Sequence, residues 1–434
     1  MNWSAAWPYL LLAALAIGGH LWWRARKEAR HATQWAQAVA AGLNEPPSLH
    51  PVIDPARCIG SGSCVKVCPE QALGMVGGKA ALVNASACIG HGACHAACPF
   101  DAISLVIGTE RRGVDIPLLQ PNFETNVPGL FIAGELGGMG LIRKAAEQGR
   151  QAMDAIAQRG HAPAGDMLDV VIIGAGPAGL SAGLAAIDNG LRYRIVEQEG
   201  SLGGSIFHYP RQKVAMTAPV QLALVGTVKF TEVSKERLLE FWHGVVLKFQ
   251  LAIQFGERME RIEPADGGFV VATSRGTLRT RSVLLAIGRR GTPRTLGVPG
   301  EELPKVTYRL TDAAQDAGRA VLVVGGGDSA LEAAIALASA PRTRVTLSYR
   351  GEAFSRVKPT NRDSLARLRE AGRVDVRLRS DVLAIAAHDV TLRCADGATV
   401  NLPNDAVIAC TGGVLPTPLL KGIGIRFETK HGTA

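Results

Sequence analysis

The sequence of 434 residues has few aromatic side chains, and its positive charge is not gathered into any long basic run. Aromatic residues make up only 5% of the chain, whereas glycine occurs 50 times. Because β-strands favour aromatic residues, this composition suits glycine-rich turns between α/β units better than a β-sandwich. The formal net charge of +9 accompanies no nucleic-acid-binding signature, so we expect no nucleic acid partner. The length predicts two to four domains.

Charged residues are also absent from residues 3–23, an apolar stretch that as a helix would span roughly 31 Å, the hydrocarbon thickness of a membrane. Tryptophans occur at both of its ends, no Lys or Arg precedes it, and basic residues follow from Arg24 onward. It lacks the basic start and the small-residue cleavage site of a signal peptide. The pattern predicts an uncleaved, single-pass anchor in the inner (cytoplasmic) membrane, with the following residues in the cytoplasm.

Six of the eight cysteines lie in two copies of one pattern, thirty residues apart. Residues 58–69 read CIGSGSCVKVCP, and residues 88–99 read CIGHGACHAACP. Each copy lacks the second cysteine of the Cys-x2-Cys-x2-Cys-x3-Cys-Pro run that binds iron–sulfur clusters, and Ser61 and His91 stand in its place. Zinc cassettes bring tighter cysteine pairs without the proline, and disulphides need an oxidising compartment. The pattern therefore predicts iron–sulfur ligation.

Over about 55 residues this region resembles the bacterial two-cluster ferredoxins. The resemblance implies an exchange, in which the last cysteine of each run serves the other cluster. One cluster would be held by Cys58, Cys64 and Cys98, and the other by Cys88, Cys94 and Cys68. Each cluster is expected as [4Fe-4S] or [3Fe-4S]. Three options stay open for each vacant corner: it stays empty, Ser61 or His91 binds iron there, or water or a partner fills it.

A glycine fingerprint joins an apolar strand to a helix within residues 169–180, and the next strand ends in an acid, Glu197. Such glycines allow a tight turn and close approach to a pyrophosphate, while the acid suits a ribose hydroxyl pair. The pattern predicts a dinucleotide-binding fold. The predicted contacts are Gly174, Gly176, Gly179 and Glu197, with Gly203 and Gly204 of a nearby turn.

A second fingerprint follows the strand that starts at Ala320, with Gly325, Gly327 and Ser329 in its turn. The next strand has Ser348 where the first fold has its acid, and two cations, Arg350 and Arg356, follow it. A missing acid with nearby cations is the pattern that accepts a 2′-phosphate. We therefore favour NADP(H) over NAD(H) as the nucleotide of this fold.

Together the two folds resemble the thioredoxin-reductase-like flavoproteins, whose first fold holds FAD and whose second holds NAD(P)H. In that family a flavin-contacting segment follows the second fold. Here its counterpart, residues 125–140 with Gly134, Glu135 and Met139, precedes the first fingerprint, and Glu135 replaces the family's usual aspartate. We interpret this order as circular permutation.

Thioredoxin reductases proper carry a Cys-x-x-Cys before the second fingerprint, and residues 306–318 contain no cysteine. Dithiol chemistry at that position is thereby excluded. The resemblance is closer to thioredoxin-reductase-type ferredoxin–NADP reductases.

This set of cofactors predicts an NAD(P)H-dependent FAD/iron–sulfur oxidoreductase, because flavin and clusters together convert a hydride pair into single electrons. No side-chain acid or base is predicted as a catalyst. The expected partner is a one-electron carrier: a ferredoxin, a cytochrome or a membrane redox protein. A homodimer is left open. The alternative is a non-catalytic electron-wiring or redox-sensing subunit of a membrane complex.

The expected fold class is α/β, with two Rossmann-like dinucleotide-binding domains, an α+β ferredoxin-like domain and one N-terminal transmembrane helix. The expected parts are a membrane anchor (1–23), a helical stalk and linker (24–51), a ferredoxin-like domain (52–107), a permuted flavin-contacting segment (108–160), an FAD-binding domain (161–295), an NAD(P)-binding domain (296–412) and a return segment to the FAD domain (413–434).

Overall fold

The computed structural model describes residues 3–40, 46, 49–88, 90–110, 113–138, 140–163, 165–209, 211, 213–289, 291–354 and 357–432. The chain divides into two compact units. The first comprises Met1–Gly113, Ala353–Arg362 and His431–Ala434, and the second comprises Val114–Glu352 and Asp363–Lys430.

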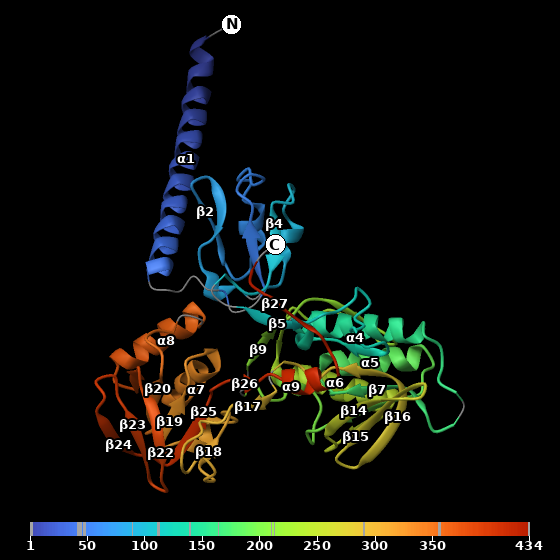
Figure 1. Ribbon diagram of the computed structural model, residues 1–434. Coiled ribbons are helices and arrows are strands. Elements are labelled where there is room, and N and C mark those ends of the chain that lie inside the picture. Colours follow the sequence, from blue (N-terminus) through green and yellow to red (C-terminus); the bar gives the residue numbers. More distant parts are fainter. Residues whose placement is uncertain are drawn as a thin grey trace. The chain divides into compact units, whose positions relative to one another are not determined.

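The first unit contains a long helix and a small cysteine-rich fold of short strands and helical turns (Figure 1). Its elements are α1 (Trp3–Ala40), β1 (His50–Ile53), α2 (Ser63–Val67), β2 (Leu73–Val76), β3 (Lys79–Leu82), η1 (Ala85–Ala87), α3 (Ala93–Ala96) and β4 (Ile103–Val106). Strand β1 pairs antiparallel with β4, and β2 forms a hairpin with β3. Each half of the repeat thus contributes one short helix and one strand of each pair. The two halves share a hydrophobic core that includes Cys58, Cys64 and Cys94.

Helix α1 corrects the prediction for the N-terminal stretch. Among the described residues, no helix combines the length and the apolar character that crossing a membrane requires. The predicted transmembrane anchor, and with it the inner-membrane location, is therefore wrong. The apolar half of α1 also contains Pro8, Gly18, Gly19 and the polar His20, which lower its apolar character. The same helix continues without a break into the charged residues 24–30.

The charged half of α1 instead packs on the β2–β3 hairpin of the same unit. The Nδ1 atom of His31 accepts a hydrogen bond from Met75 N at 3.0 Å, and Glu28 Oε1 accepts one from Gly78 N at 2.6 Å. These bonds use two backbone N–H groups of the hairpin. Burial, together with the charge of Lys27, lowers the pKa of His31, so its imidazole is neutral and able to accept at neutral pH.

The second unit begins with a Rossmann-like fold on a seven-stranded sheet of order β13-β8-β7-β16-β15-β14, with β6 paired to β16. Strands β13, β8, β7 and β6 run parallel to the end of β16, and β14 and β15 extend the sheet antiparallel. Helices α4 and α5 pack against each other in contact with it. The elements are β5 (Val114–Pro117), β6 (Leu130–Ile132), η2 (Glu135–Gly137), α4 (Ile142–Ala157), β7 (Leu168–Ile173), α5 (Pro177–Asp188), β8 (Tyr193–Glu197), η3 (Gly204–Ile206), β9 (Val214–Met216), β10 (Val220–Leu222), β11 (Gly226–Val228), β12 (Glu232–Ser234), α6 (Lys235–Phe249), β13 (Ile253–Phe255), β14 (Met259–Ala265), β15 (Gly268–Thr273) and β16 (Gly276–Leu285).

The segment that precedes the first fingerprint is part of this sheet. Strand β6 pairs in parallel with β16, with Leu130 opposite Val283. Helix α4 then runs back and lies so close to α5 that a Cβ atom on Gly149 would stand 2.0 Å from the carbonyl oxygen of Ala178. Only glycine permits this approach, so β6 and α4 pack as integral elements of the fold.

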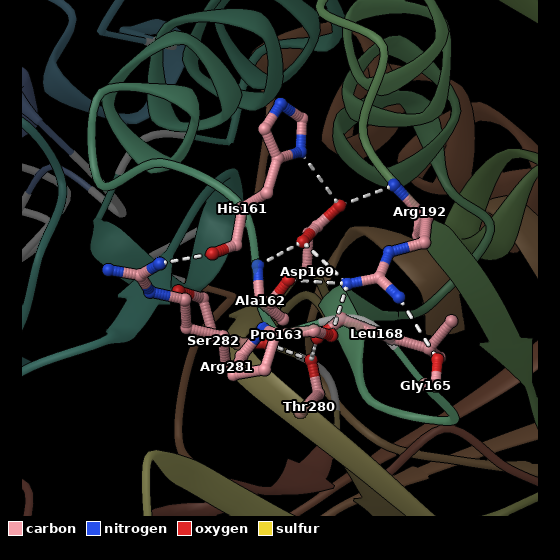
Figure 2. Close-up of polar contacts among 10 residues, drawn as sticks. All are labelled: His161, Ala162, Pro163, Gly165, Leu168, Asp169, Arg192, Thr280, Arg281 and Ser282. Atoms are coloured by element: carbon pink, nitrogen blue, oxygen red, sulfur yellow. Dashed lines mark hydrogen bonds and ion pairs between the residues drawn. The ribbon is translucent and has the colours of Figure 1, made fainter.

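A network around Asp169 fastens the connection from α4 to β7 (Figure 2). The Asp169 carboxylate accepts hydrogen bonds from Ala162 N at 2.5 Å and Arg192 N at 2.7 Å, and it lies 3.2 Å from His161 Nδ1. The Arg192 guanidinium in turn donates to the carbonyl oxygens of Ala162, Pro163 and Gly165. This connection is thereby held at the edge where the parallel strands begin.

The last strand of the second unit pairs with its first. Strand β27 (Phe427–Lys430) runs antiparallel to β5, with Lys430 opposite Val114. Asn126 strengthens this join, because its side chain donates to Gly424 O at 2.9 Å and accepts from Arg426 N at 2.7 Å. Residues about 300 positions apart in sequence therefore form one hairpin-like pair.

The second Rossmann-like fold has a parallel sheet of order β18-β25-β19-β20-β21 and a small antiparallel sheet β22-β23-β24. Its elements are β17 (Thr292–Pro293), β18 (Val306–Thr307), η4 (Ala313–Asp316), β19 (Ala320–Val324), α7 (Asp328–Ser339), β20 (Arg344–Tyr349), α8 (Pro359–Glu370), β21 (Val374–Leu378), β22 (Asp381–Ile385), β23 (Asp389–Arg393), β24 (Thr399–Pro403), β25 (Ala406–Ala409) and β26 (Gly413–Val414). Helix α9 (Thr417–Gly422) follows and packs on the first fold, because Leu420 lies in the same hydrophobic core as Leu130 and Val171. Strand β17 pairs with β26 beside it.

Candidate functional site: paired cysteine hollows and two glycine cradles

Two hollows in the first unit are each lined by three cysteines. One is lined by Cys58, Cys64 and Cys98, and the other by Cys68, Cys88 and Cys94. Each hollow thus takes two cysteines from one cassette and the last cysteine from the other. This is the grouping that the ferredoxin resemblance implied, and ligation of iron by these residues stays a prediction.

The positions that lack a cysteine also face these hollows. Ser61 lines the hollow of Cys58, Cys64 and Cys98, and its side chain is exposed. His91 lines the other hollow, and its Nε2 atom is buried without a hydrogen-bond partner among the described residues. A carboxylate that the sequence reasoning did not single out, Glu70, lines the same hollow as His91.

The cysteine thiols lie in an environment that suits a bound metal cluster. Burial raises the pKa of Cys88 to about 11, and it also raises the pKa values of Cys64 and Cys94. The backbone N–H of Ala102 donates to Cys98 Sγ at 3.4 Å, a contact that stabilises negative charge on sulfur. Buried sulfurs that are protonated when metal-free must release protons on binding iron, so the site fits a ligand that compensates thiolate charge.

Among the described residues, no three His, Cys, Asp or Glu side chains come close enough together to hold a single metal ion. The cysteines of each triad instead surround a hollow. A multi-iron cluster is the kind of group whose ligands are arranged in this way.

The first glycine cradle lies where β7 ends and α5 begins. Gly174 has φ +106°, and a Cβ atom there would stand 2.6 Å from Ala286 O. A Cβ atom on Gly179 would stand 1.8 Å from Gly174 O, whereas one on Gly176 would meet nothing closer than 3.9 Å. The first and third glycines are therefore required by packing, and the second leaves open space at a helix N-terminus, as a pyrophosphate needs.

The predicted acid and the second turn lie beside this cradle. Glu197 is only 6% exposed, and its carboxylate accepts hydrogen bonds from Ala175 N at 2.7 Å and Glu199 N at 2.9 Å. Burial raises its pKa. Gly203 N donates to Ala175 O at 2.9 Å, so the turn of Gly203 and Gly204 contacts the fingerprint loop directly. The structure thus brings these predicted residues together at the carboxyl edge of the sheet.

The upstream segment reaches the same edge. Ala133 N donates to Leu285 O at 3.1 Å, and Gly134, with φ +86°, follows with its N–H bonded to Gln148 Oε1 at 2.9 Å. Glu135 begins η2, while Met139 lies outside the described residues. The sequence reasoning missed Arg289, which follows β16: burial lowers its pKa against the charges of Glu135 and Asp115. Its position just after the Gly288 turn was the available signal.

The second glycine cradle repeats the arrangement of the first. A Cβ atom on Gly325 would stand 2.4 Å from Cys410 O, whereas one on Gly327 would meet nothing within 4 Å. Ser329 is exposed in the first turn of α7. The ring of Tyr349 packs on this loop, because a Cβ atom on Gly326 would stand 2.2 Å from it. Sequence reasoning did not single out this aromatic contact.

The residues predicted to determine which nucleotide binds begin at the end of β20. Ser348 is fully buried, and its Oγ lies 2.7 Å from Ser380 Oγ, so it presents no acid at this edge. Arg350 is exposed directly after the strand. Arg356 lies outside the described residues.

The two glycine cradles and the cysteine-lined fold define a class: a flavin- and NAD(P)-dependent oxidoreductase with an iron–sulfur domain. Residues 171–433 match the sequence profile of the pyridine nucleotide-disulphide oxidoreductases, and residues 50–99 match that of the 4Fe-4S dicluster domain. The chain belongs to the pyridine nucleotide-disulphide oxidoreductase family.

Its relatives include proteins that are named as reductases of different kinds. Bacilliredoxin reductase Bdr of Bacillus subtilis is 28% identical over 267 residues, which are 60% of this chain and 82% of the relative. A ferredoxin–NADP reductase of Thermus thermophilus is 35% identical over 276 residues, which are 61% of this chain and 79% of the relative. The structure of bacillithiol disulfide reductase Bdr from Staphylococcus aureus matches with 28% identity and a TM-score of 0.53, over 59% of this chain and 80% of that one.

Proposed function

We propose that this protein exchanges electrons between NADPH and a one-electron carrier of the ferredoxin type, through FAD held in the first cradle and clusters held in the cysteine hollows. When bound, these groups supply hydride transfer and single-electron transfer. The chain's own residues bind and orient them. The observation that carries the proposal is the presence of two three-cysteine hollows in one chain with two glycine cradles.

The number and positions of the cysteines favour a one-electron acceptor over a disulphide acceptor. Beyond the two cassettes the sequence has only Cys394 and Cys410, which directly follow two different strands, β23 and β25. These two cysteines do not have the Cys-x-x-Cys spacing of a dithiol relay. The ferredoxin–NADP reductase relatives therefore offer the better analogy for the acceptor.

NADPH is favoured over NADH by the edge of the second fold. An acid at the end of β20 would repel a 2′-phosphate, and the buried Ser348 removes that repulsion. The exposed Arg350 supplies a cation next to it, and we propose that Arg350 and Arg356 bind the phosphate. The remaining predicted contacts, Gly325, Gly327 and Ser329, would hold the pyrophosphate at the start of α7.

Anaerobic titration tests the function. We expect NADPH to bleach the flavin of fully loaded protein at lower concentration than NADH, and then to reduce a two-cluster ferredoxin but not a low-molecular-weight disulphide. The same disulphide is also offered to a Cys394→Ser, Cys410→Ser double variant. If the wild type and this variant released thiol from it at the same rate, the result would count against the one-electron acceptor. Failure of both nucleotides to bleach the flavin would refute the proposal as a whole.

We also propose that the order of the flavin fold arose by circular permutation. Three contacts support it: the parallel pairing of β6 with β16, the close packing of α4 on α5, and the antiparallel pairing of β27 with β5. A rearranged chain that runs from residue 166 to residue 430, continues through a short turn into residue 114 and ends at residue 160 tests the idea. We expect it to fold and bind FAD, because every strand pairing of the sheet is kept.

A further inference from the structure

The two cassettes place position 61 and position 91 in the same backbone setting. The flanking glycines are all left-handed, with φ values of +78° and +71° at Gly60 and Gly62 and of +75° and +80° at Gly90 and Gly92. A short helix, α2 or α3, follows each loop and carries a buried cysteine in its first turn. Ser61 and His91 are therefore equivalent in the repeat, and each faces a hollow lined by three cysteines.

The loop around His91 is fixed by packing. A Cβ atom on Gly90 would stand 2.5 Å from Leu49 O, and one on Gly92 would stand 3.3 Å from Leu105 Cδ1. Leu105 lines the same hollow as His91. A side chain at Gly90 would collide with a backbone oxygen, and one at Gly92 would press on Leu105, so packing fixes the loop that places the imidazole at the hollow.

The Nε2 atom of His91 needs a partner that the described residues do not provide. It is buried and has no hydrogen-bond partner among the described residues. A buried polar nitrogen without a partner is destabilising, and folded proteins rarely tolerate one without a functional reason. A metal ion bound through the nitrogen lone pair removes this cost, and imidazole is an accepted ligand of iron in clusters that have lost cysteines.

We propose that His91 Nε2 binds iron at the vacant corner of the cluster held by Cys68, Cys88 and Cys94. This inference rests on the proposed iron–sulfur ligation. A neutral imidazole in place of a thiolate leaves that cluster with one negative charge fewer than four cysteines would give, which raises its reduction potential. The clusters are then unequal, because Ser61 provides no nitrogen at the equivalent corner. Glu70, which lines the same hollow, is the rival ligand.

Pulsed EPR of the anaerobically purified, chemically reduced full-length protein tests the assignment. In the wild type we expect a hyperfine coupling from a directly bound ¹⁴N nucleus. It should disappear in His91→Ala and persist in two matched controls. These are His95→Ala, which removes an exposed histidine four residues away on α3, and Ser61→Ala, which changes the equivalent corner.

The variant His91→Cys keeps the test decisive if His91→Ala fails to assemble a cluster. It should retain a four-iron cluster, lose the nitrogen coupling and shift one cluster to lower potential. Intact clusters without nitrogen coupling in the wild type, or coupling that survives in both His91 variants, would overturn the proposal and point to Glu70 or water. Protein without iron and acid-labile sulfide would instead defeat the iron–sulfur part of the proposed function, even if NADPH still reduced the flavin.

Discussion

Replacing Asp169 with asparagine is expected to destabilise the flavin-binding fold by about 2–4 kcal/mol at neutral pH. The side chain is only 1% exposed, and its carboxylate accepts from Ala162 N and Arg192 N while facing the Arg192 guanidinium at 3.5 Å (Figure 2). An amide keeps one acceptor oxygen but turns an NH₂ group toward a buried donor. One hydrogen bond to a charged group, about 1.5–3 kcal/mol, is thereby lost, and a donor is left unsatisfied. Asp169→Ala loses both acceptors and should cost about 3–5 kcal/mol.

The size of this effect should depend on pH. Burial works to raise the pKa of Asp169, but hydrogen bonds from Ala162, Arg192 and His161 outweigh it and hold the pKa below its ordinary value. The carboxylate's contribution to stability is therefore fully present above the unfolded pKa of about 4 and is lost as the pH falls through the lower folded pKa. Asparagine does not titrate, so the difference between wild type and Asp169→Asn should shrink in acid.

Unfolding in urea, monitored by the release of the bound flavin, measures the change in the free energy of unfolding of the fold that contains Asp169. Asp166→Asn is the matched control, because Asp166 is an exposed aspartate of the same connection. It should change the free energy of unfolding by less than about 0.5 kcal/mol. If Asp169→Asn were as stable as this control at pH 7, the network would not fasten the connection and the reasoning would be refuted.

Three further predictions concern the cofactor sites. Gly179→Ala should sharply lower the ratio of bound flavin to protein, measured by absorbance, because its Cβ would stand 1.8 Å from a backbone oxygen that cannot move independently. Arg350→Ala should raise the KM for NADPH about tenfold, the equivalent of one charged contact, while the KM for NADH stays unchanged in steady-state assays. Cys98→Ser should remove iron and acid-labile sulfide from one cluster site and leave flavin reduction by NADPH intact, since its hollow is lined by three cysteines and loses one ligand.

Much of the candidate site could be predicted because its residues are constrained by local rules. Gly174 and Gly325 occupy conformations with positive φ that only glycine adopts readily. The positions of these glycines in the sequence therefore predict the two turns. The cysteine spacing likewise follows from how a loop wraps a cluster. Ser348 was informative because it replaces an acid at a position that strand and turn define.

What the sequence did not reveal depends on contacts between distant residues. The pairing of Lys430 with Val114 and the network that joins Asp169 to Arg192 have no local signature. Arg289 is another case, since its proximity to Glu135 arises only when β6 and β16 pair. The predicted anchor was wrong because it rested on local composition alone. The composition of residues 3–23 indicated a membrane span, whereas these residues belong to one continuous helix, α1, that also has a charged half.

The connection that the proposed reordering adds to the flavin fold lies on one side of the sheet. Parallel strands begin at one edge and end at the other, and cofactors bind where they end. The connection that leads into β7 passes the edge where strands begin, near Asp169, and the β5–β27 pair lies outside the seven-stranded sheet. The glycine loop, Glu197 and the end of β6 are all at the opposite edge. The connection from α4 into β7 at the first edge therefore leaves the backbone groups of the cofactor edge in place, and the proposed reordering adds this connection without changing the glycine loop.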